Sequence, residues 1–203
     1  MNELDCVKAT IKTGNEKLTF NNKALGFTLL DFWCWSVSDI MSNATRGVFA
    51  EFIVATAAKI DLNEVRSEWG AFDLKTKEGI KIEVKSSAYL QTWFQKALSK
   101  ISFGTKAAFV IDIITNKQSE LKIRSADVYV FCLLHHKDKR TVQPLNLDHW
   151  EFYVLATEQL NNYVRSQHSI SLNSLKRLTV AVDYENLGNE IKMKNIFNNK
   201  NRS

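Results

Sequence analysis

Acidic and basic side chains alternate with apolar ones in the segment 72–87, FDLKTKEGIKIEVKSS. Glu83 and Lys85 are two residues apart, so in a strand they share one face, opposite the apolar residues beside them. Asp73 precedes them in the same segment. Two carboxylates can hold Mg²⁺ together with water and phosphate oxygens, and a lysine beside them can orient or deprotonate a water molecule. These residue types therefore indicate metal-assisted hydrolysis of a phosphate ester.

A hairpin register is predicted that places Asp73 beside Glu83. We expect a three-residue loop ending in Gly79, because glycine tolerates the left-handed conformation that such loops require. Leu74 then pairs with Ile82, and the apolar side chains of both strands face the core. A shift of one residue would turn one strand over, so the hydrophobic pattern selects this register. Two facing carboxylates are unfavourable without a cation, which favours a metal site over a solvated face of mixed charges.

Further candidate residues flank this hairpin. Upstream, Glu51 is the only charge in a helical stripe of small apolar residues, so it either joins the site or forms an ion pair with a lysine or arginine. Downstream, Gln91 and Gln95 are one turn apart on an expected helix, either near phosphate or simply exposed. The candidates for nucleic-acid contact are Gln95 and five basic or hydroxyl residues: Arg46, Lys75, Lys81, Ser86 and Ser87. Arg46 could instead contact a carboxylate or lie on the surface.

A series of helices and strands must position these residues. Hydrophobic periodicity predicts helices over 28–41 and 44–60, the second capped by Asn43, then strands over 64–69, 71–76 and 80–86. A helix over 90–101 and strands over 107–115, 126–134 and 150–156 follow, with short helices near 157–163 and 171–178. This order predicts an α/β fold with a mixed central sheet flanked by helices.

The residues of this segment resemble a known family. Glu51 on a helix, Asp73, and Glu83-Val84-Lys85 followed by Gln91 resemble the PD-(D/E)XK nuclease superfamily, whose restriction-endonuclease-like core runs helix, three strands, helix, strand. The phrases RGVFAEFIVA, IEVKSSAYLQTW and ADVYVF also resemble an uncharacterised bacterial group of stand-alone restriction-endonuclease-like proteins. The motif's proline is replaced here by Phe72, a departure that is frequent in the superfamily.

The resemblance implies a role for each matching residue. Asp73 and Glu83 would bind Mg²⁺, with Mn²⁺ as a substitute, Lys85 would assist the water nucleophile, and Glu51 would lie near the metal. Val84 is included in the predicted metal site and Gln91 among the predicted catalytic residues. We expect a single restriction-endonuclease-like domain over 1–190, with its catalytic core over about 43–115, and a basic polar tail over 191–203.

Composition sets the remaining expectations. The 203 residues are 45% hydrophobic with one proline, and the formal net charge is +5, which favours a polyanion such as DNA. Three cysteines without a CxxC pair fit neither a disulfide framework nor a zinc ribbon. We therefore expect a cytoplasmic, metal-dependent DNA endonuclease without a membrane partner; two-strand cuts would suggest a homodimer. The alternatives are an RNA-directed nuclease and a non-cleaving nucleic-acid-binding module of the same fold.

Overall fold

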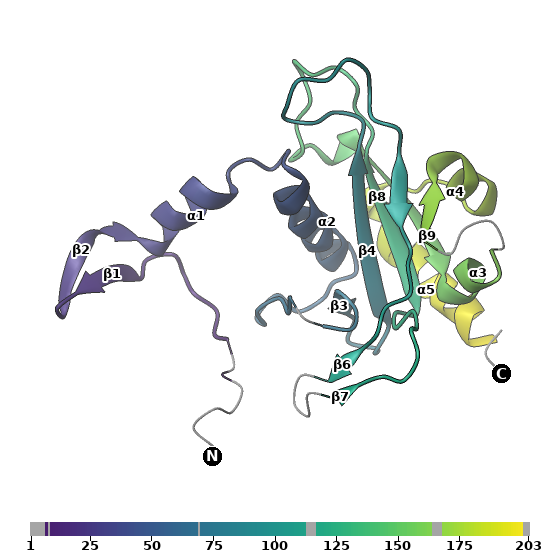
Figure 1. Cartoon of the computed structure of the whole chain (residues 1–203), viewed down its shortest axis with the longest axis horizontal. Coiled ribbons are helices and arrows are strands. Elements are labelled where there is room, and N and C mark those ends of the chain that lie inside the picture. Colours follow the sequence, from purple (N-terminus) through teal and green to yellow (C-terminus); the bar gives the residue numbers. More distant parts are fainter. Residues whose placement is uncertain (1–6, 8, 69, 113–116, 164–167, 201–203) are drawn as a thin grey trace.

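A four-stranded mixed sheet forms the centre of the protein (Figure 1). The computed structural model describes residues 7, 9–68, 70–112, 117–163 and 168–200. The strands lie in the order β3-β4-β8-β9; β4 and β8 are parallel, and the two outer pairings are antiparallel. Their bounds are β3 Leu74–Lys75, β4 Lys81–Ala88, β8 Val128–Leu134 and β9 Trp150–Ala156.

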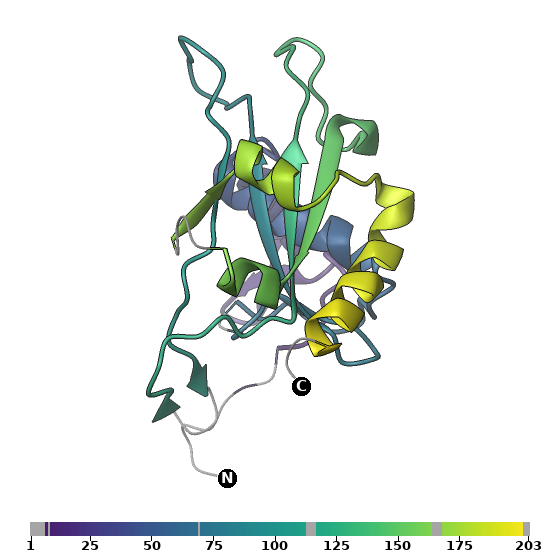
Figure 2. The ribbon, with the colours of Figure 1, turned by 90° about the vertical axis from the view of Figure 1, so that its right-hand side faces the viewer.

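Helices and short strands surround this sheet (Figures 1 and 2). The helices are α1 Leu29–Val37, α2 Asn43–Ala57, α3 Thr157–Asn161, α4 Leu172–Leu178 and α5 Tyr184–Lys200, with a 3-10 turn at Leu147–His149. The short strands are β1 Lys17–Phe20, β2 Lys23–Thr28, β5 Ser102–Gly104, β6 Ile111–Asp112, β7 Lys117–Gln118 and β10 Ser169–Ser171. None of the helices in the described part of the chain is both long and apolar enough to cross a bilayer.

Each face of the sheet has its own apolar core. On one face, Ile82 and Val84 of β4 pack with residues of α2 and α5. On the other face, Phe131 of β8 packs with residues of α3, α4, β5 and β10. The successive side chains of β8 alternate between these two cores, and all seven of its residues are buried. The predicted α/β fold, a mixed sheet flanked by helices, is confirmed.

The predicted hairpin register is also confirmed. Leu74 pairs with Ile82 and Lys75 with Lys81. Gly79 has a φ of 92°, the left-handed conformation expected at the end of the loop. Ile82 and Val84 therefore point into the core, and Glu83 and Lys85 point to the opposite side of β4.

One predicted strand is wrong, and a second is much shorter than predicted within the described residues. In the segment 64–69, residues 64–68 have no regular secondary structure, and residue 69 lies outside the described residues. In the segment 107–115, only 111–112 form a strand, which pairs with β7, and 113–116 lie outside the described residues. An apolar run does not determine a strand's neighbour, and β8 occupies the central position instead because its two faces supply both cores.

The predicted polar tail over 191–203 continues α5 as a helix as far as Lys200, and 201–203 lie outside the described residues. Leu187 and Ile191 are fully buried against the core that α2 also covers. A Cβ at Gly188 would lie 2.4 Å from the carbonyl oxygen of Ala57, so glycine allows the two helices to approach closely. This packing stabilises a helix that its polar, asparagine-rich sequence did not indicate.

An N-terminal arm, residues 9–37, extends away from the sheet beyond α2 (Figure 1). It consists of the β1–β2 hairpin and α1, which begins with a capping box: Thr28 Oγ1 accepts from the Asp31 amide, and Asp31 accepts from the Thr28 amide at 2.7 Å. The amide of Leu30 donates to the carbonyl oxygen of Gly14 at 2.9 Å. The arm is thus tied together internally, and the segment 38–42 joins it to α2.

Candidate active site

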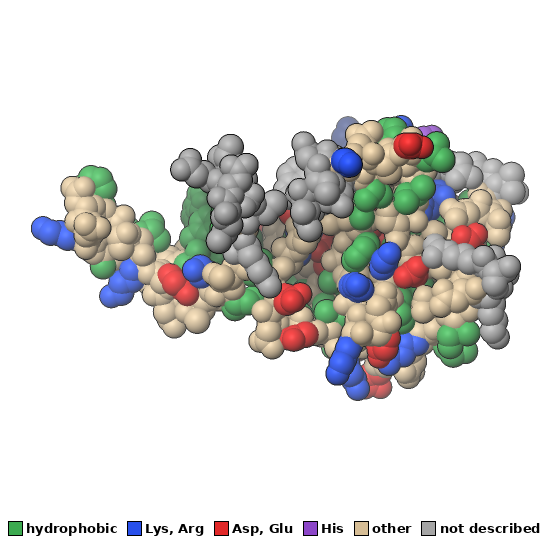
Figure 3. Space-filling model, turned by 90° about the horizontal axis from the view of Figure 1, so that it is seen from below, with side chains coloured by type: hydrophobic (Ala, Val, Ile, Leu, Met, Phe, Trp, Pro, Cys, Tyr) green, Lys and Arg blue, Asp and Glu red, His purple; other side chains and the backbone are tan. Residues whose placement is uncertain are grey.

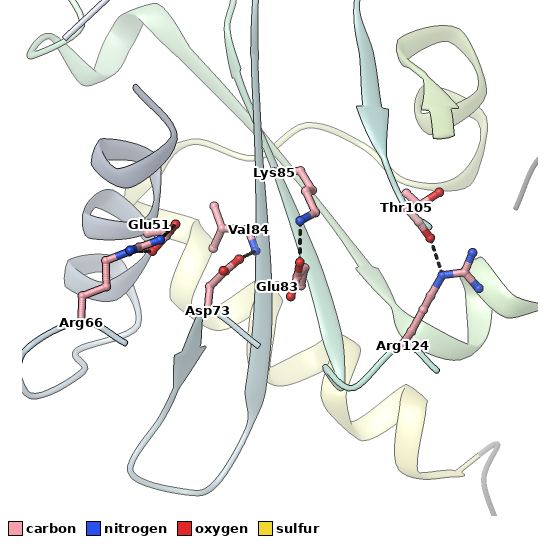
Figure 4. A network of polar contacts seen from close by, with 8 residues as sticks. All are labelled: Glu51, Arg66, Asp73, Glu83, Val84, Lys85, Thr105 and Arg124. Carbon is pink, nitrogen blue, oxygen red and sulfur yellow. Dashed lines mark hydrogen bonds and ion pairs between the residues drawn. The ribbon is translucent and has the colours of Figure 1, made fainter. Parts of the chain in front are cut away.

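Asp73 lies where the two strands of the hairpin separate. The pairing of β3 with β4 covers only two residues of β3, and Asp73 comes immediately before them. Its Oδ2 accepts a hydrogen bond from the backbone N–H of Val84 at 2.7 Å (Figure 4). This bond satisfies an N–H that would otherwise be unpaired at the edge of the sheet. The local fold therefore holds the Asp73 carboxylate beside the Glu83–Lys85 segment, as the register predicts.

The environment of Asp73 disfavours its charge. Burial raises the pKa of Asp73 most, and the nearby Glu83 carboxylate raises it further, to about 6. The hydrogen bond from Val84 opposes this shift, as does the weaker attraction of Lys85, while Glu51 adds to it. A carboxylate that is desolvated and close to like charge favours a cation beside it.

Glu83 and Lys85 form an ion pair on the open face of β4. Lys85 Nζ lies 2.5 Å from Glu83 Oε1, and both side chains are partly exposed. Glu83 neighbours Tyr129 of β8, a buried residue that the sequence analysis missed. Burial, and then the charge of Glu83, raises the pKa of Tyr129, so its phenol stays protonated at neutral pH. Tyr129 becomes a candidate only once the β4–β8 register is known, because nothing in the run ADVYVF marks it.

Glu51 is held by Arg66 on the other side of Asp73 (Figure 4). The guanidinium binds the carboxylate with two nitrogens: Nη2 donates to Oε1 at 2.8 Å, and Nε donates to Oε2. Glu51 is only 8% exposed. Of the two roles that the sequence left open for it, the structure shows the ion pair, and Arg66 is its partner. The sequence did not indicate Arg66 as a site residue, because it lies in the segment 64–69, which was predicted to be a strand.

A hollow of about 480 Å³ lies beside this group. Glu51, Arg66 and Asp73 line it, together with apolar residues of α2 and of the segment 60–74; Glu83 and Lys85 do not. Asp73 thus lies between two environments, the hollow on the α2 side and the Glu83–Lys85 pair on the open face of β4.

Asp73 and Glu83 are the residues best placed to hold a metal ion. Among the described residues, no group of three or more His, Cys, Asp or Glu side chains is close enough for metal binding. Two carboxylates suit Mg²⁺, which keeps several waters and takes further oxygens from phosphate. Val84 is 7% exposed with its side chain in the core, so only its backbone could contribute. The donor set therefore fits a magnesium ion shared with substrate.

Arg46 is buried rather than on the surface, with 3% exposure. Its guanidinium donates to three neutral acceptors: the carbonyl oxygen of Met41 at 2.8 Å, Oδ1 of Asn43 at 2.6 Å and Oγ of Ser86 at 3.3 Å. Burial lowers the pKa of Arg46. The arginine thus links the start of α2 to β4 at the residue next to Lys85. Ser42, not the predicted Asn43, caps this helix.

The helix predicted over 90–101 is absent from this fully described segment, which is an irregular loop. Gln95 explains why: its Oε1 accepts from the Gln91 amide at 2.7 Å, and its Nε2 donates to the Tyr89 carbonyl oxygen at 3.1 Å. Side-chain amides replace the helical backbone bonds, and the apolar side chain of Phe94 is 83% exposed. Gln91 Oε1 is buried without a hydrogen-bond partner among the described residues.

The other predicted nucleic-acid contacts remain on the hairpin and β4. Lys75 and Lys81 face each other across the hairpin with exposed side chains. Lys81 Nζ lies 5.6 Å from the centre of the Phe72 ring. Ser87 is partly buried, two residues beyond Lys85 on β4. The two lysines give the hairpin a concentrated positive charge close to Asp73.

A family model for bacteriophage T4 endonuclease IV matches residues 28–174, which is most of the chain. The chain belongs to the bacteriophage T4 endonuclease IV family. No curated protein matches the chain. Membership of this family confirms the expectation of a nuclease, and the matched span contains every predicted site residue from Arg46 to Gln95. The β1 strand and α5 lie outside it.

Proposed function

We propose that this member of the T4 endonuclease IV family is a Mg²⁺-dependent deoxyribonuclease of the PD-(D/E)XK type that cuts within DNA strands. The proposal rests on the cross-strand pair of Asp73 and Glu83 with Lys85 beside it. The raised pKa of Asp73 supports it, because a crowded carboxylate pair is stabilised by a divalent cation. Mn²⁺ would substitute for Mg²⁺.

Each residue of the group has a proposed task. Asp73 and Glu83 would hold the ion, which when bound neutralises negative charge on the phosphate undergoing hydrolysis. Lys85, which pairs with Glu83 as an ammonium ion, would orient the attacking water and offset the negative charge that develops on the phosphate. The protonated phenol of Tyr129, which neighbours Glu83 in the β4–β8 pairing, would offer that carboxylate a hydrogen-bond donor.

Glu51 and Arg46 would act as positioning residues. Glu51 would fix Arg66 at the wall of the hollow and tune Asp73 by its charge. Arg46 would hold β4 through Ser86, because its guanidinium is buried and already bonded. The unpaired Oε1 of Gln91 is a site for a water or a substrate donor at the end of β4. Ser87, Lys75 and Lys81 are proposed contacts to the nucleic-acid backbone, whereas Gln95, whose amide is bonded within its loop, would hold that loop in place.

The proposal is tested by incubating the protein with supercoiled plasmid, single-stranded DNA and RNA of matched length, in Mg²⁺, Mn²⁺ or EDTA. We expect nicking or cutting of DNA in either metal and none in EDTA. Asp73→Ala and Lys85→Ala should each lower the rate by about 10³-fold or more, the effect typical of removing transition-state electrostatic stabilisation. Lys77→Ala, an exposed lysine of the same hairpin turn, should keep the wild-type rate.

The outcomes separate the alternatives. Cutting of RNA but not of DNA would replace the proposal with an RNA-directed nuclease. Binding without cutting in both metals would favour a non-cleaving module. Full activity in EDTA, or in Asp73→Ala, would refute the metal site.

A further inference from the structure

The α1 helix of the N-terminal arm is apolar on all sides. Seven of its nine residues are hydrophobic, and none of the nine, all of which the structure describes, is buried. Trp35 is 85% exposed, more than any other aromatic side chain in the described chain. A helix that is hydrophobic all round normally lies in a protein core or in a membrane. Nine residues are too few to span a bilayer, which favours another protein surface as the cover of this helix.

The arm does not find that surface in its own chain. In the described residues, α1 packs on β2 and makes no extensive contact with the helices or sheet of the body. The ring of Trp33 lies over Gly14, so this aromatic side chain is packed within the arm. Phe20, Phe27 and Phe32 remain more than half exposed. A short helix and a two-stranded hairpin are each marginal alone, so their well-formed shape requires packing from outside.

We propose that the arm of one copy packs on the body of a second copy, against the outer face of α2, and that the second arm returns the contact. On that face, Val48 and Phe52 are about half exposed at the rim of the hollow. The short segment 38–42 between α1 and α2 keeps each arm outside its own body, the arrangement from which exchange between copies arises. The Glu83–Lys85 pair stays uncovered, because it lies on the opposite side of β4.

Charge complementarity favours this partner. The arm carries exposed lysines in its hairpin, Lys17 and Lys23, and one just before it, Lys12. The segment 61–68 beside α2 carries exposed acids, Asp61, Glu64 and Glu68. Figure 3 shows basic side chains toward the end of the projecting arm and acidic side chains on the part of the body nearest to it. Two copies related by a twofold axis would place each basic hairpin beside the acidic segment of the other.

The available area also suffices. Each aromatic side chain offers about 150–250 Å² when buried, and four on the arm, Phe20, Phe27, Phe32 and Trp35, are more than half exposed. A twofold contact uses this surface twice and buries a matching area on each body. The total reaches the roughly 1,200–2,000 Å² of a stable interface, so a second copy alone can cover the arm.

The test is the molar mass of the full chain, measured by light scattering across a micromolar dilution series. We expect twice the 23.3 kDa of one chain. Phe32→Ser with Trp35→Ser should halve this mass. Phe94→Ser removes an aromatic ring about as exposed as that of Trp35 from the loop after β4, and should leave the dimer intact. A wild-type monomer, or a dimer that survives the double substitution with an unchanged circular dichroism spectrum, would overturn the proposal.

Cross-linking then locates the contact. Cys34 of α1 is exposed and Cys132 is buried, so in a Cys6→Ser background only Cys34 is available for coupling. Adding Val48→Cys should give a covalent dimer on mild oxidation, whereas Leu145→Cys, an exposed position after β8, should not. A covalent dimer formed through Cys34 alone would mean that the arms pack on each other, and would refute packing on α2. This inference does not depend on the proposed catalytic activity, since mass and cross-linking need no substrate.

Discussion

Two acidic side chains line the hollow, and their charges are compensated to different extents. On α2, Glu51 is matched by the guanidinium of Arg66, which approaches with two nitrogens and leaves the pair close to neutral. On the hairpin, Asp73 has a second acid, Glu83, as its neighbour and one backbone N–H as its main compensation. The first region is a completed ion pair, and the second is short of positive charge.

This difference in charge compensation indicates which of the two acids is available to bind a cation. Breaking a satisfied buried ion pair leaves an uncompensated charge, so Glu51 stabilises the fold as it stands. An acid whose pKa is raised by burial and like charge costs stability until something positive binds. Substitutions at the two positions should therefore change stability with opposite signs.

The largest expected effect is the loss of cleavage in Asp73→Asn. Asparagine keeps the size of the side chain and an oxygen for the Val84 N–H, but removes the charge needed for metal binding. We expect DNA cleavage in Mg²⁺ to fall by about 10³-fold or more. Mg²⁺ should raise the melting temperature of the wild type and not that of the variant. A variant stabilised by Mg²⁺ as strongly as the wild type would move the metal away from Asp73.

The next effect is a loss of stability in Glu51→Gln. The substitution leaves the Arg66 guanidinium without its carboxylate, and we expect urea unfolding to show a loss of about 1–3 kcal/mol. Cleavage should fall by roughly 10–100-fold, as for residues that orient a metal site indirectly. Glu51→Gln combined with Arg66→Gln should cost less than the sum of the single changes. Strict additivity would mean that the ion pair contributes nothing.

The sequence predicted the placement of Asp73 beside Glu83, because residues close together in the chain determine it. Apolar alternation and the glycine turn fix the register of Leu74 with Ile82, and that register places Asp73 beside Glu83. The strands β8 and β9 were equally clear, since long buried runs admit few other structures.

What the sequence did not show depends on partners distant along the chain. Arg66 reaches Glu51 from a loop without regular structure, and Tyr129 meets Glu83 only through the parallel pairing of β4 with β8. The segment 90–101 has helical spacing, yet Gln95 bonds to the backbone and prevents the helix. The polar sequence of α5 is helical because Leu187 is buried against the sheet. Tertiary contacts override local propensity in each case.

The pH dependence of the unfolding free energy tests the environment of Asp73 separately from that of Glu51. Its folded pKa of about 6 lies above the ordinary value of 3.8. Stability from this group therefore rises as pH falls through 6 and levels off below about 3.8. In EDTA at pH 8, Asp73→Asn should exceed the wild type in unfolding free energy by up to roughly 3 kcal/mol, because each pKa unit corresponds to about 1.4 kcal/mol. The advantage should vanish by pH 4, and an advantage independent of pH would exclude titration of Asp73 as its source.

The smallest effect concerns the like-charged pair of Lys75 and Lys81, which mirrors the two acids with opposite sign. The two lysines pair directly across the hairpin, and like charges at such positions are unfavourable until an anion such as phosphate binds beside them. Lys81→Gln should therefore raise the stability of the free protein by about 0.2–0.5 kcal/mol in urea unfolding. The same change should weaken DNA binding and lower the slope of log affinity against log salt by about one. Lys77→Gln removes an equal charge from the turn of the same hairpin, and should leave both quantities almost unchanged. Equal salt slopes for the two variants would show that the repulsion between Lys75 and Lys81 has no part in binding phosphate.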